Sequence, residues 1–418
     1  MDDLQSSHAA GAPEATRAAA VDAPPPAIPA AAGVVYDVRW SEALPCWLLF
    51  RAAGAAFAPT VILLATLGCL ATWAGWSLAD RLQLAGVDRT ADLVAAASEG
   101  LVLPSGGATA APPSAAGWPL AAPPTGRALP WLAGLLDRLP SALAEILRLA
   151  AIPFRPLATG PQVAGAAARL AWFVLVWSIF GTGIARHVAL KLVGEDAPGL
   201  FASIWYGTQK WLSSFNAVAF VILGMLALAV PGALLGLLMR SDIGLAVAGA
   251  VWPIVLAGAV VLAILAVGVV AGWPLMVGAV GVERGDSFQA ISTAFSYLYQ
   301  RPLHYAFSLV VAAIVAIPAL AAAGVFADAT ASLAMWAASF GMGHDRTAAV
   351  LRDAAAAGAD VPWGARAIGF WMRSLEAVLA SFGWGYFWSI ATAAYLLLRR
   401  DVDGTECDEV VLDEPAGG

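Results

Sequence analysis

Residues 281–302, GVERGDSFQAISTAFSYLYQRP, form a polar stretch with helical periodicity between two long runs that carry almost no charge. Asp286 stands where a helix N-cap is expected, and Gln289 follows three residues later in the position of a capping-box partner. Pro302 is expected to close the helix. The sequence therefore predicts a capped helix over 286–301.

The apolar residues of this helix fall on one side when each residue turns it by about 100°. That side has Ala290 and Ala294 at its edge and consists of Phe288, Ile291, Phe295, Leu298 and Tyr299. The polar side consists of Gln289, Ser292, Thr293, Ser296 and Gln300. A helix this short and this polar on one face is unsuited to cross a bilayer, so we expect it to lie along the cytoplasmic interface.

The whole chain has the composition of an integral membrane protein. Of its 418 residues, 60% are hydrophobic and 12% are charged, whereas soluble domains carry roughly 25% charged residues. A hydrocarbon core about 30 Å thick needs roughly 20 apolar residues in a helix. Runs of that length lie at 57–79, 166–184, 215–239, 247–271, 304–326 and 374–398. We therefore predict an all-α, polytopic membrane helix bundle with about six transmembrane helices.

The fourth run extends over 243–282, which is too long for one crossing even when the helix is tilted. Trp-Pro pairs interrupt it at 252–253 and 273–274. Proline ends or kinks a helix because it lacks an N–H donor and crowds the preceding turn. We expect one crossing over 247–271 that continues as a kinked extension, and two tight crossings are the alternative.

The predicted spans divide the chain into five regions. Residues 1–33 are rich in Ala and Pro and are expected to form a disordered tail. Residues 34–79 hold an interfacial segment and the first span, and residues 80–165 form a non-cytoplasmic loop with a Pro/Gly/Ala linker and an amphipathic helix. A five-span bundle over 166–400 follows. Residues 401–418 form an acidic cytoplasmic tail, which holds Asp401, Asp403, Glu406, Asp408, Glu409, Asp413 and Glu414.

A second stretch with an acidic start and a helical apolar stripe, residues 194–212, lies between the second and third spans. At a spacing of 87 residues, identical residues recur in this region and in the connector between the fourth and fifth spans. The pairs are Gly194 with Gly281, Phe201 with Phe288, Ile204 with Ile291, Ala219 with Ala306 and Phe220 with Phe307. The pattern predicts a parallel internal repeat over about 166–239 and 247–326, with two cytoplasmic interfacial amphipathic helices. The alternative is a pair of independent connectors.

Basic residues near the span ends predict the orientation, because loops rich in Lys and Arg stay in the cytoplasm. The predicted inner loops and the end of the last span hold Arg186, Lys191, Lys210, Arg284, Arg301, Arg399 and Arg400. The short loop between the third and fourth spans holds only Arg240. We therefore expect both termini in the cytoplasm, and the loops 80–165 and 327–373 on the other side.

The run ERGDSFQAISTAFSYLYQRPLHYAF, residues 283–307, resembles the connector of bacterial multi-span membrane proteins of uncharacterised function. It is more distantly similar to the membrane domain of glycerophosphodiester phosphodiesterase-type proteins. Glu283, Ser287 and Ala290 carry the resemblance. It implies a six-span fold in a bacterial inner (plasma) membrane and no catalytic residues, and no phosphodiesterase catalytic domain accompanies the connector in this sequence.

Glu376 is the one carboxylate that falls inside a predicted span. An ionisable group in a membrane indicates a functional site, because burial of its charge costs about 2.5 kcal/mol or more. Arg373 precedes it by three residues, so the two side chains share one helix face and are expected to pair near the interface. A proton or substrate role for this intramembrane pair is the alternative.

The tryptophans concentrate near predicted span ends, which is typical of an aromatic belt at the membrane interfaces. Examples are Trp205, Trp211, Trp273, Trp371 and Trp388.

No catalytic, nucleotide-binding or metal-binding motif occurs in the sequence, and we expect no cofactor. The net charge of −7 comes from the acidic tail, so the chain has no basic face for nucleic acid. The favoured hypothesis is a non-enzymatic scaffold or accessory subunit, which contacts the lipid bilayer and presents its cytoplasmic face or acidic tail to a protein partner. The alternative is a small-molecule transporter or permease that uses the repeated spans and Glu376. Few polar residues lie within the spans, which favours the first hypothesis.

Overall fold

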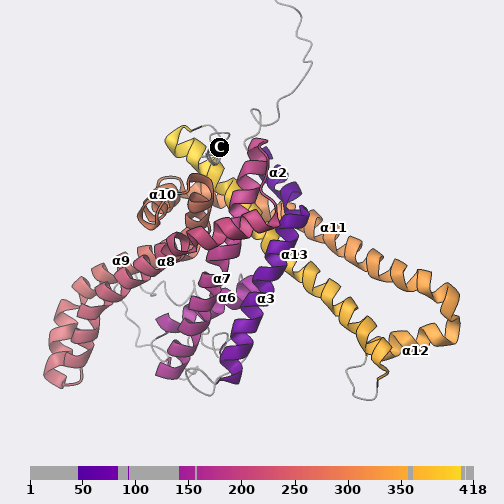
Figure 1. Ribbon diagram of the computed structural model, residues 1–418. Coiled ribbons are helices and arrows are strands. Elements are labelled where there is room, and N and C mark those ends of the chain that lie inside the picture. The colour runs from indigo at the N-terminus through magenta and orange to yellow at the C-terminus, as the bar shows by residue number, and fades with distance from the viewer. Residues whose placement is uncertain are drawn as a thin grey trace, which may run out of the picture. The chain divides into compact units, whose positions relative to one another are not determined.

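The computed structural model describes residues 46–82, 93, 141–155, 158–355, 361–405 and 410 (Figure 1). All secondary-structure elements within these ranges are helices, so the all-α prediction is confirmed. The predicted N-terminal tail, the Pro/Gly/Ala linker and most of the acidic tail lie outside the described residues.

The described helices follow the chain without large interruptions after residue 158. They are α2 (Trp47–Ala56), α3 (Pro59–Arg81), α6 (Ser141–Ala151), the short 3₁₀ helix η1 (Ile152–Phe154), α7 (Gly160–Val193), α8 (Leu200–Leu238), α9 (Asp242–Glu283), α10 (Ser287–Gln300), α11 (Pro302–Met342), α12 (His344–Ala355) and α13 (Trp363–Asp403).

Five of these helices, α3, α7, α8, α9 and α11, are long and apolar enough to cross a membrane. The chain is therefore a multi-pass membrane protein. The sixth predicted span, 374–398, lies within α13, which is not among the five. From Ser381 to Leu398 most residues of α13 are buried against other helices, so this helix needs fewer apolar side chains than one that faces lipid.

The predicted separation between an interfacial helix over 194–212 and a span over 215–239 is wrong. Both segments belong to the single continuous helix α8, which begins at Leu200. The junction contains no proline, and nothing there removes a backbone donor from the helix, so the helix continues into the apolar run.

The prediction of a separate helix over 286–301 is confirmed, because α10 begins at Ser287 and ends at Gln300. The Asp286 carboxylate caps it by accepting the backbone N–H of Gln289 at 2.8 Å. The Gln289 side chain does not complete a capping box; its amide donates instead to Glu283. Pro302 stands at the first position of α11, where a proline is well tolerated because its missing N–H would have no helical partner.

The long run 243–282 lies in one continuous helix, α9, which includes both Pro253 and Pro274. The single-helix interpretation is therefore the correct one. Helix α11 also extends beyond the predicted span, because the Ala-rich sequence after residue 326 continues the helix until Gly343, whose φ of 75° lies in the left-handed region. The predicted loop over 327–373 is thus mostly helical.

Glycines allow the central helices α7, α9 and α13 to approach closely. A Cβ placed at Gly281 of α9 would lie 2.7 Å from Cβ of Ala185 on α7, and one at Gly278 would lie 3.0 Å from Cβ of Tyr395 on α13. Small residues at such contacts are typical of helix packing in membranes, where close backbone approach replaces the hydrophobic driving force.

Helices α8 and α9 run side by side as a hairpin, and α12 links α11 to α13 (Figure 1). Many bulky apolar side chains on α8, α9 and α11 are exposed, such as Leu223, Ile254 and Ile317 at 63%, 74% and 71%. The buried side of α11 instead consists of Tyr305, Ser308, Ala312, Val315, Ala319 and Ala327. This division of bulky outer and smaller inner residues fits helices that are surrounded by lipid.

Candidate functional site

The charged ends of α9, α10, α11 and α13 meet in a cluster that we call the polar end. It consists of Glu283, Tyr297, Arg301, His304, Tyr395, Arg399, Asp401 and Asp403. Each helix contributes these residues at or near its end, so the contacts fix the four ends to one another.

Glu283, the last residue of α9, joins three helices. Its Oε1 lies 3.3 Å from Nε of Arg399 on α13 and also accepts the hydroxyl of Tyr395. Its Oε2 accepts the side-chain amide of Gln289 on α10 at 2.9 Å. The Glu283 and Arg399 side chains are only 15% and 14% exposed. Each of these buried charges is paired, and Glu283 accepts two further hydrogen bonds, which is the condition under which buried ions are tolerated.

The end of α13 makes a second set of contacts. Oδ2 of Asp401 lies 3.2 Å from Nε of Arg301 and 3.0 Å from Nδ1 of His304. Asp403 accepts the hydroxyl of Tyr297 on α10. Burial, followed by the hydrogen bond and negative charge of Asp403, raises the pKa of Tyr297 above its usual range. The phenol therefore stays protonated and remains a hydrogen-bond donor.

One face of α10 packs against the bundle. Ala290, Ala294 and Tyr297 are buried, whereas Phe288 is 69% exposed. Its ring stacks on Phe220 of α8, with centroids 5.0 Å apart. Ala290 and Ala294 permit close helix packing against the bundle, whereas Phe288 lies outside.

Two side chains from the first half of the chain, Lys210 and Tyr206, contact the end of α9. Nζ of Lys210 donates to the carbonyl of Arg284 at 2.6 Å, and the hydroxyl of Tyr206 donates to the carbonyl of Val280 at 2.7 Å. The guanidinium carbons of Arg186 and Arg284 lie 5.4 and 5.7 Å from the Tyr206 ring centroid. These are cation–π distances. Several of the basic residues predicted for inner loops thus lie at one end of the bundle.

The predicted pair Arg373 and Glu376 lies on an exposed part of α13. Nη1 of Arg373 approaches the carbonyl of Ala354 at 3.5 Å. Within the described ranges, the structure gives no ion pair between Arg373 and Glu376. A functional role for the two residues stays a prediction.

Buried hydroxyl groups in the long helices bond mostly within the protein. Thr72 and Ser308 each donate to the carbonyl four residues earlier, and Thr392 does the same. Thr182 on α7 and Ser214 on α8 bond to each other at 2.8 Å. Among the described residues, the buried hydroxyl of Ser178 has no such partner. Hydroxyls that bond to their own helix have no strong donor left for a solute.

Tryptophan and phenylalanine side chains form a second feature, which the sequence interpretation missed. Trp177 and Trp384 stack with centroids 5.0 Å apart, and Trp388 stacks on Trp177 at 5.8 Å. Phe173 and Trp273 extend this cluster with edge contacts at 5.5 Å. The aromatic-belt prediction is therefore wrong for Trp273 and Trp388, which pack inside the bundle.

For the exposed tryptophans the aromatic belt stays a prediction. Trp205 and Trp371 are 67% and 70% exposed.

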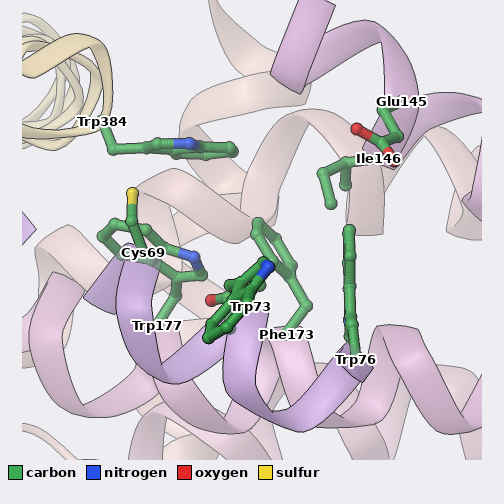
Figure 2. A pocket seen from close by; sticks show the side chains of 9 residues that line it. Cys69, Trp73, Trp76, Glu145, Ile146, Phe173, Trp177 and Trp384 are labelled. Carbon is green, nitrogen blue, oxygen red and sulfur yellow. The ribbon is translucent and has the colours of Figure 1, made fainter. Parts of the chain in front are cut away.

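A cavity of about 310 Å³ adjoins the aromatic cluster (Figure 2). Its lining comes from α3, α6, α7 and α13 and consists of Cys69, Thr72, Trp73, Trp76, Glu145, Ile146, Phe173, Trp177 and Trp384. The sequence did hold a signal for it, since aromatic residues recur at spacings of three and four in 73–76, 173–177 and 384–388. Only the fold brings these three stripes together.

Comparison of the chain with known protein families, curated proteins and solved structures found no match.

Proposed function

We propose that the protein is a non-enzymatic scaffold or accessory subunit of a bacterial inner membrane, and that the polar end faces the cytoplasm. The polar end would hold the helix ends in a fixed arrangement and carry the acidic tail toward a protein partner. The resemblance of residues 283–307 to connectors in bacterial multi-span proteins agrees with this setting.

The observation that carries the proposal is that most of the buried or clustered polar side chains bond to other groups of the protein. At the polar end, Glu283, Asp401 and Asp403 each bond to a neighbouring helix. Between the membrane helices, most buried hydroxyls bond to their own helix or to one another. A transport path needs polar groups that are free to bind a solute inside the membrane, whereas a scaffold needs helix ends that keep their arrangement.

The proposed orientation rests on the distribution of basic residues. Lys210, Arg284 and Arg399 contact α9 or belong to its end. Positive charges near span ends favour the cytoplasmic side. The polar end thus carries the charge that is expected to remain in the cytoplasm.

The acidic tail divides into two parts with different roles. Asp401 and Asp403 belong to α13 and bond within the protein. The other five acidic residues of the tail, which lie outside the described residues, are Glu406, Asp408, Glu409, Asp413 and Glu414. The proposal assigns partner binding to these five alone.

The test is crosslinking in the native membrane followed by purification in mild detergent, with the full chain and with a chain that ends at Thr405. This truncation keeps Asp401 and Asp403 and so leaves the polar end intact. We expect one partner in a fixed ratio with the full chain and its loss from the shortened chain. If both forms purify without a partner protein and the protein carries solute into reconstituted vesicles, the scaffold hypothesis is contradicted and the transporter hypothesis is favoured.

A matched variant tests whether partner binding needs the charge of the tail or only its length. The substitutions Glu406→Gln, Asp408→Asn, Glu409→Gln, Asp413→Asn and Glu414→Gln keep the tail but remove its charge. If the tail binds a basic partner surface, this variant should release the partner as the truncation does, and added salt should weaken the wild-type complex.

A further inference from the structure

The cavity beside α6 combines aromatic walls with one carboxylate. Figure 2 shows Trp384 and Trp76 on two sides of the space, each viewed along the edge of its ring, so that a flat face of each turns toward the interior. Phe173 lies behind and Trp73 in front, and Glu145 lies at the rim beside Ile146. Cys69 and Thr72 complete the lining with Trp177.

The aromatic walls are held in place by contacts with one another and with the backbone. Trp384 stacks on Trp177, and Phe173 meets Trp384 edge-on at 5.4 Å. The indole N–H of Trp76 donates to the carbonyl of Arg169 at 3.1 Å. The rings therefore keep their faces toward the cavity without a ligand, which reduces the entropy lost on binding.

Two polar groups at the cavity lack a complete set of partners. Trp177 is 1% exposed, and its indole N–H has no hydrogen-bond partner among the described residues. Glu145 forms no ion pair with another described residue. Arg148 lies one turn further along α6 and acts on Glu145 electrostatically. A carboxylate at an apolar rim is costly, and a cationic ligand would relieve that cost.

We propose that this cavity binds a small organic ammonium compound. The cationic group would lie against the faces of Trp76 and Trp384 with Glu145 as its counterion, and the apolar body of the ligand would fill the space beside Phe173. Indole faces attract organic cations through the ring quadrupole, and quaternary ammonium groups are recognised in this way by aromatic cages. A cavity of about 310 Å³ lies at the small end of the usual range for small-molecule sites.

The charge state of Glu145 links this site to pH. Burial raises the pKa of Glu145, and Arg148 partly opposes that rise. Cys69 is the other titratable side chain in the lining, and α7 and α13 contribute only aromatic residues to it. Since the cation needs the ionised carboxylate, its affinity should fall as the pH drops through the raised pKa of Glu145, and a neutral ligand should show no such loss.

The test measures binding of benzyltrimethylammonium to the full-length protein in nanodiscs by calorimetry, with neopentylbenzene as the uncharged ligand of the same shape. We expect saturable binding of the cation and at least about tenfold weaker binding of the neutral compound. Glu145→Gln should weaken the cation by about tenfold and leave the neutral compound unchanged. Glu195→Gln, an exposed carboxylate in the turn after α7, is the matched control and should change neither.

A second variant guards against misfolding. The Trp73 side chain is 66% exposed, so Trp73→Leu should leave the fold intact and weaken cation binding by roughly threefold. Equal binding of the cation and its neutral isostere, or undiminished cation binding by Glu145→Gln, would overturn the proposal. A lipid acyl chain that copurifies with the protein and that the cation does not displace would also overturn it. None of these results bears on the tail-dependent partner of the proposed scaffold, so the two proposals can fail separately.

Discussion

The two halves of the predicted repeat share an order of elements but differ at one junction. In the first half α7 leads into α8, which continues from Leu200 to Leu238 without a break. In the second half α9 leads into the short helix α10, and a new helix starts at Pro302. At the spacing of 87 residues, Pro302 corresponds to Phe215. The break in the second half thus coincides with Pro302, although α9 continues through Pro253 and Pro274.

The break at Pro302 also creates contacts that the first half lacks. Arg301 and His304 flank the proline, and both reach Asp401. In the first half, the corresponding segment runs inside α8. The Asp401 contacts of the polar end therefore lie at the break.

Shared identities do not always mean shared roles. Phe201 and Phe288 both lie outside the bundle, at 85% and 69% exposure. Gly194, however, ends α7 with a φ of 93°, whereas its counterpart Gly281 lies inside α9 and packs against Ala185. The left-handed residue that ends α9 is Arg284, with a φ of 59°. The matched positions thus agree in exposure for these two phenylalanines and differ at the turns.

The largest expected effect comes from introducing the break into the first half. Phe215→Pro should lower the free energy of unfolding by about 3 kcal/mol or more, because proline removes a helical hydrogen bond and crowds the preceding turn. SDS titration in mixed micelles, followed by circular dichroism, measures this. Phe215→Ala, which removes the ring but keeps the donor, is the control. Equal stability of the proline and alanine variants would show that the junction is not decisive.

The second effect tests the polar end against its counterpart. Glu283→Ala should lower the unfolding free energy by about 3 kcal/mol, since it removes a partly buried carboxylate that pairs with Arg399 and accepts the Tyr395 hydroxyl. Asp196 occupies the corresponding position in the first half and is exposed. Asp196→Ala should therefore stay within about 0.5 kcal/mol of the wild type in the same titration. Similar losses for both variants would refute the asymmetry.

A smaller effect is expected at the left-handed turn that ends α7. Gly194→Ala should destabilise by about 1 kcal/mol, because a Cβ is disfavoured at a φ of 93°. Gly199→Ala is a control of the same chemistry at an N-cap whose φ is −64°. If both substitutions cost the same, backbone strain at Gly194 is not the cause.

The smallest effect is expected for the exposed ion pair of the broken half. Arg301→Gln should change the unfolding free energy by at most about 0.5 kcal/mol, because the Arg301 side chain is 55% exposed and water screens its contact with Asp401. The difference from wild type should vanish at high salt. A loss as large as that of Glu283→Ala would mean that this pair, and not Glu283, holds the helix ends together.

Local signals in the sequence predicted much of the fold. Composition and run length identified the membrane helices, and Asp286 marked the start of α10 because an N-cap acts within one turn. The continuity of α8 and the length of α11 escaped prediction, because an apolar run does not show where a helix stops when no glycine or proline ends it.

The candidate sites depend on contacts between distant parts of the chain. Glu283 meets Arg399, and Trp177 meets Trp384, only after α13 has packed against α7 and α9. No local pattern pairs these residues. Glu376 was singled out because it falls inside an apolar run, yet it lies on an exposed part of α13, away from the polar end.

The most direct test of the account is the side of the membrane on which the polar end lies. After Cys46, Cys69 and Cys407 are replaced by serine, Ser292→Cys on α10 and Asp345→Cys on α12 provide two exposed labelling positions that α11 separates. We predict that an impermeant maleimide labels Ser292→Cys only in inside-out vesicles and Asp345→Cys only in right-side-out vesicles. Labelling of both from one side, or of Ser292→Cys from outside, would contradict a cytoplasmic polar end.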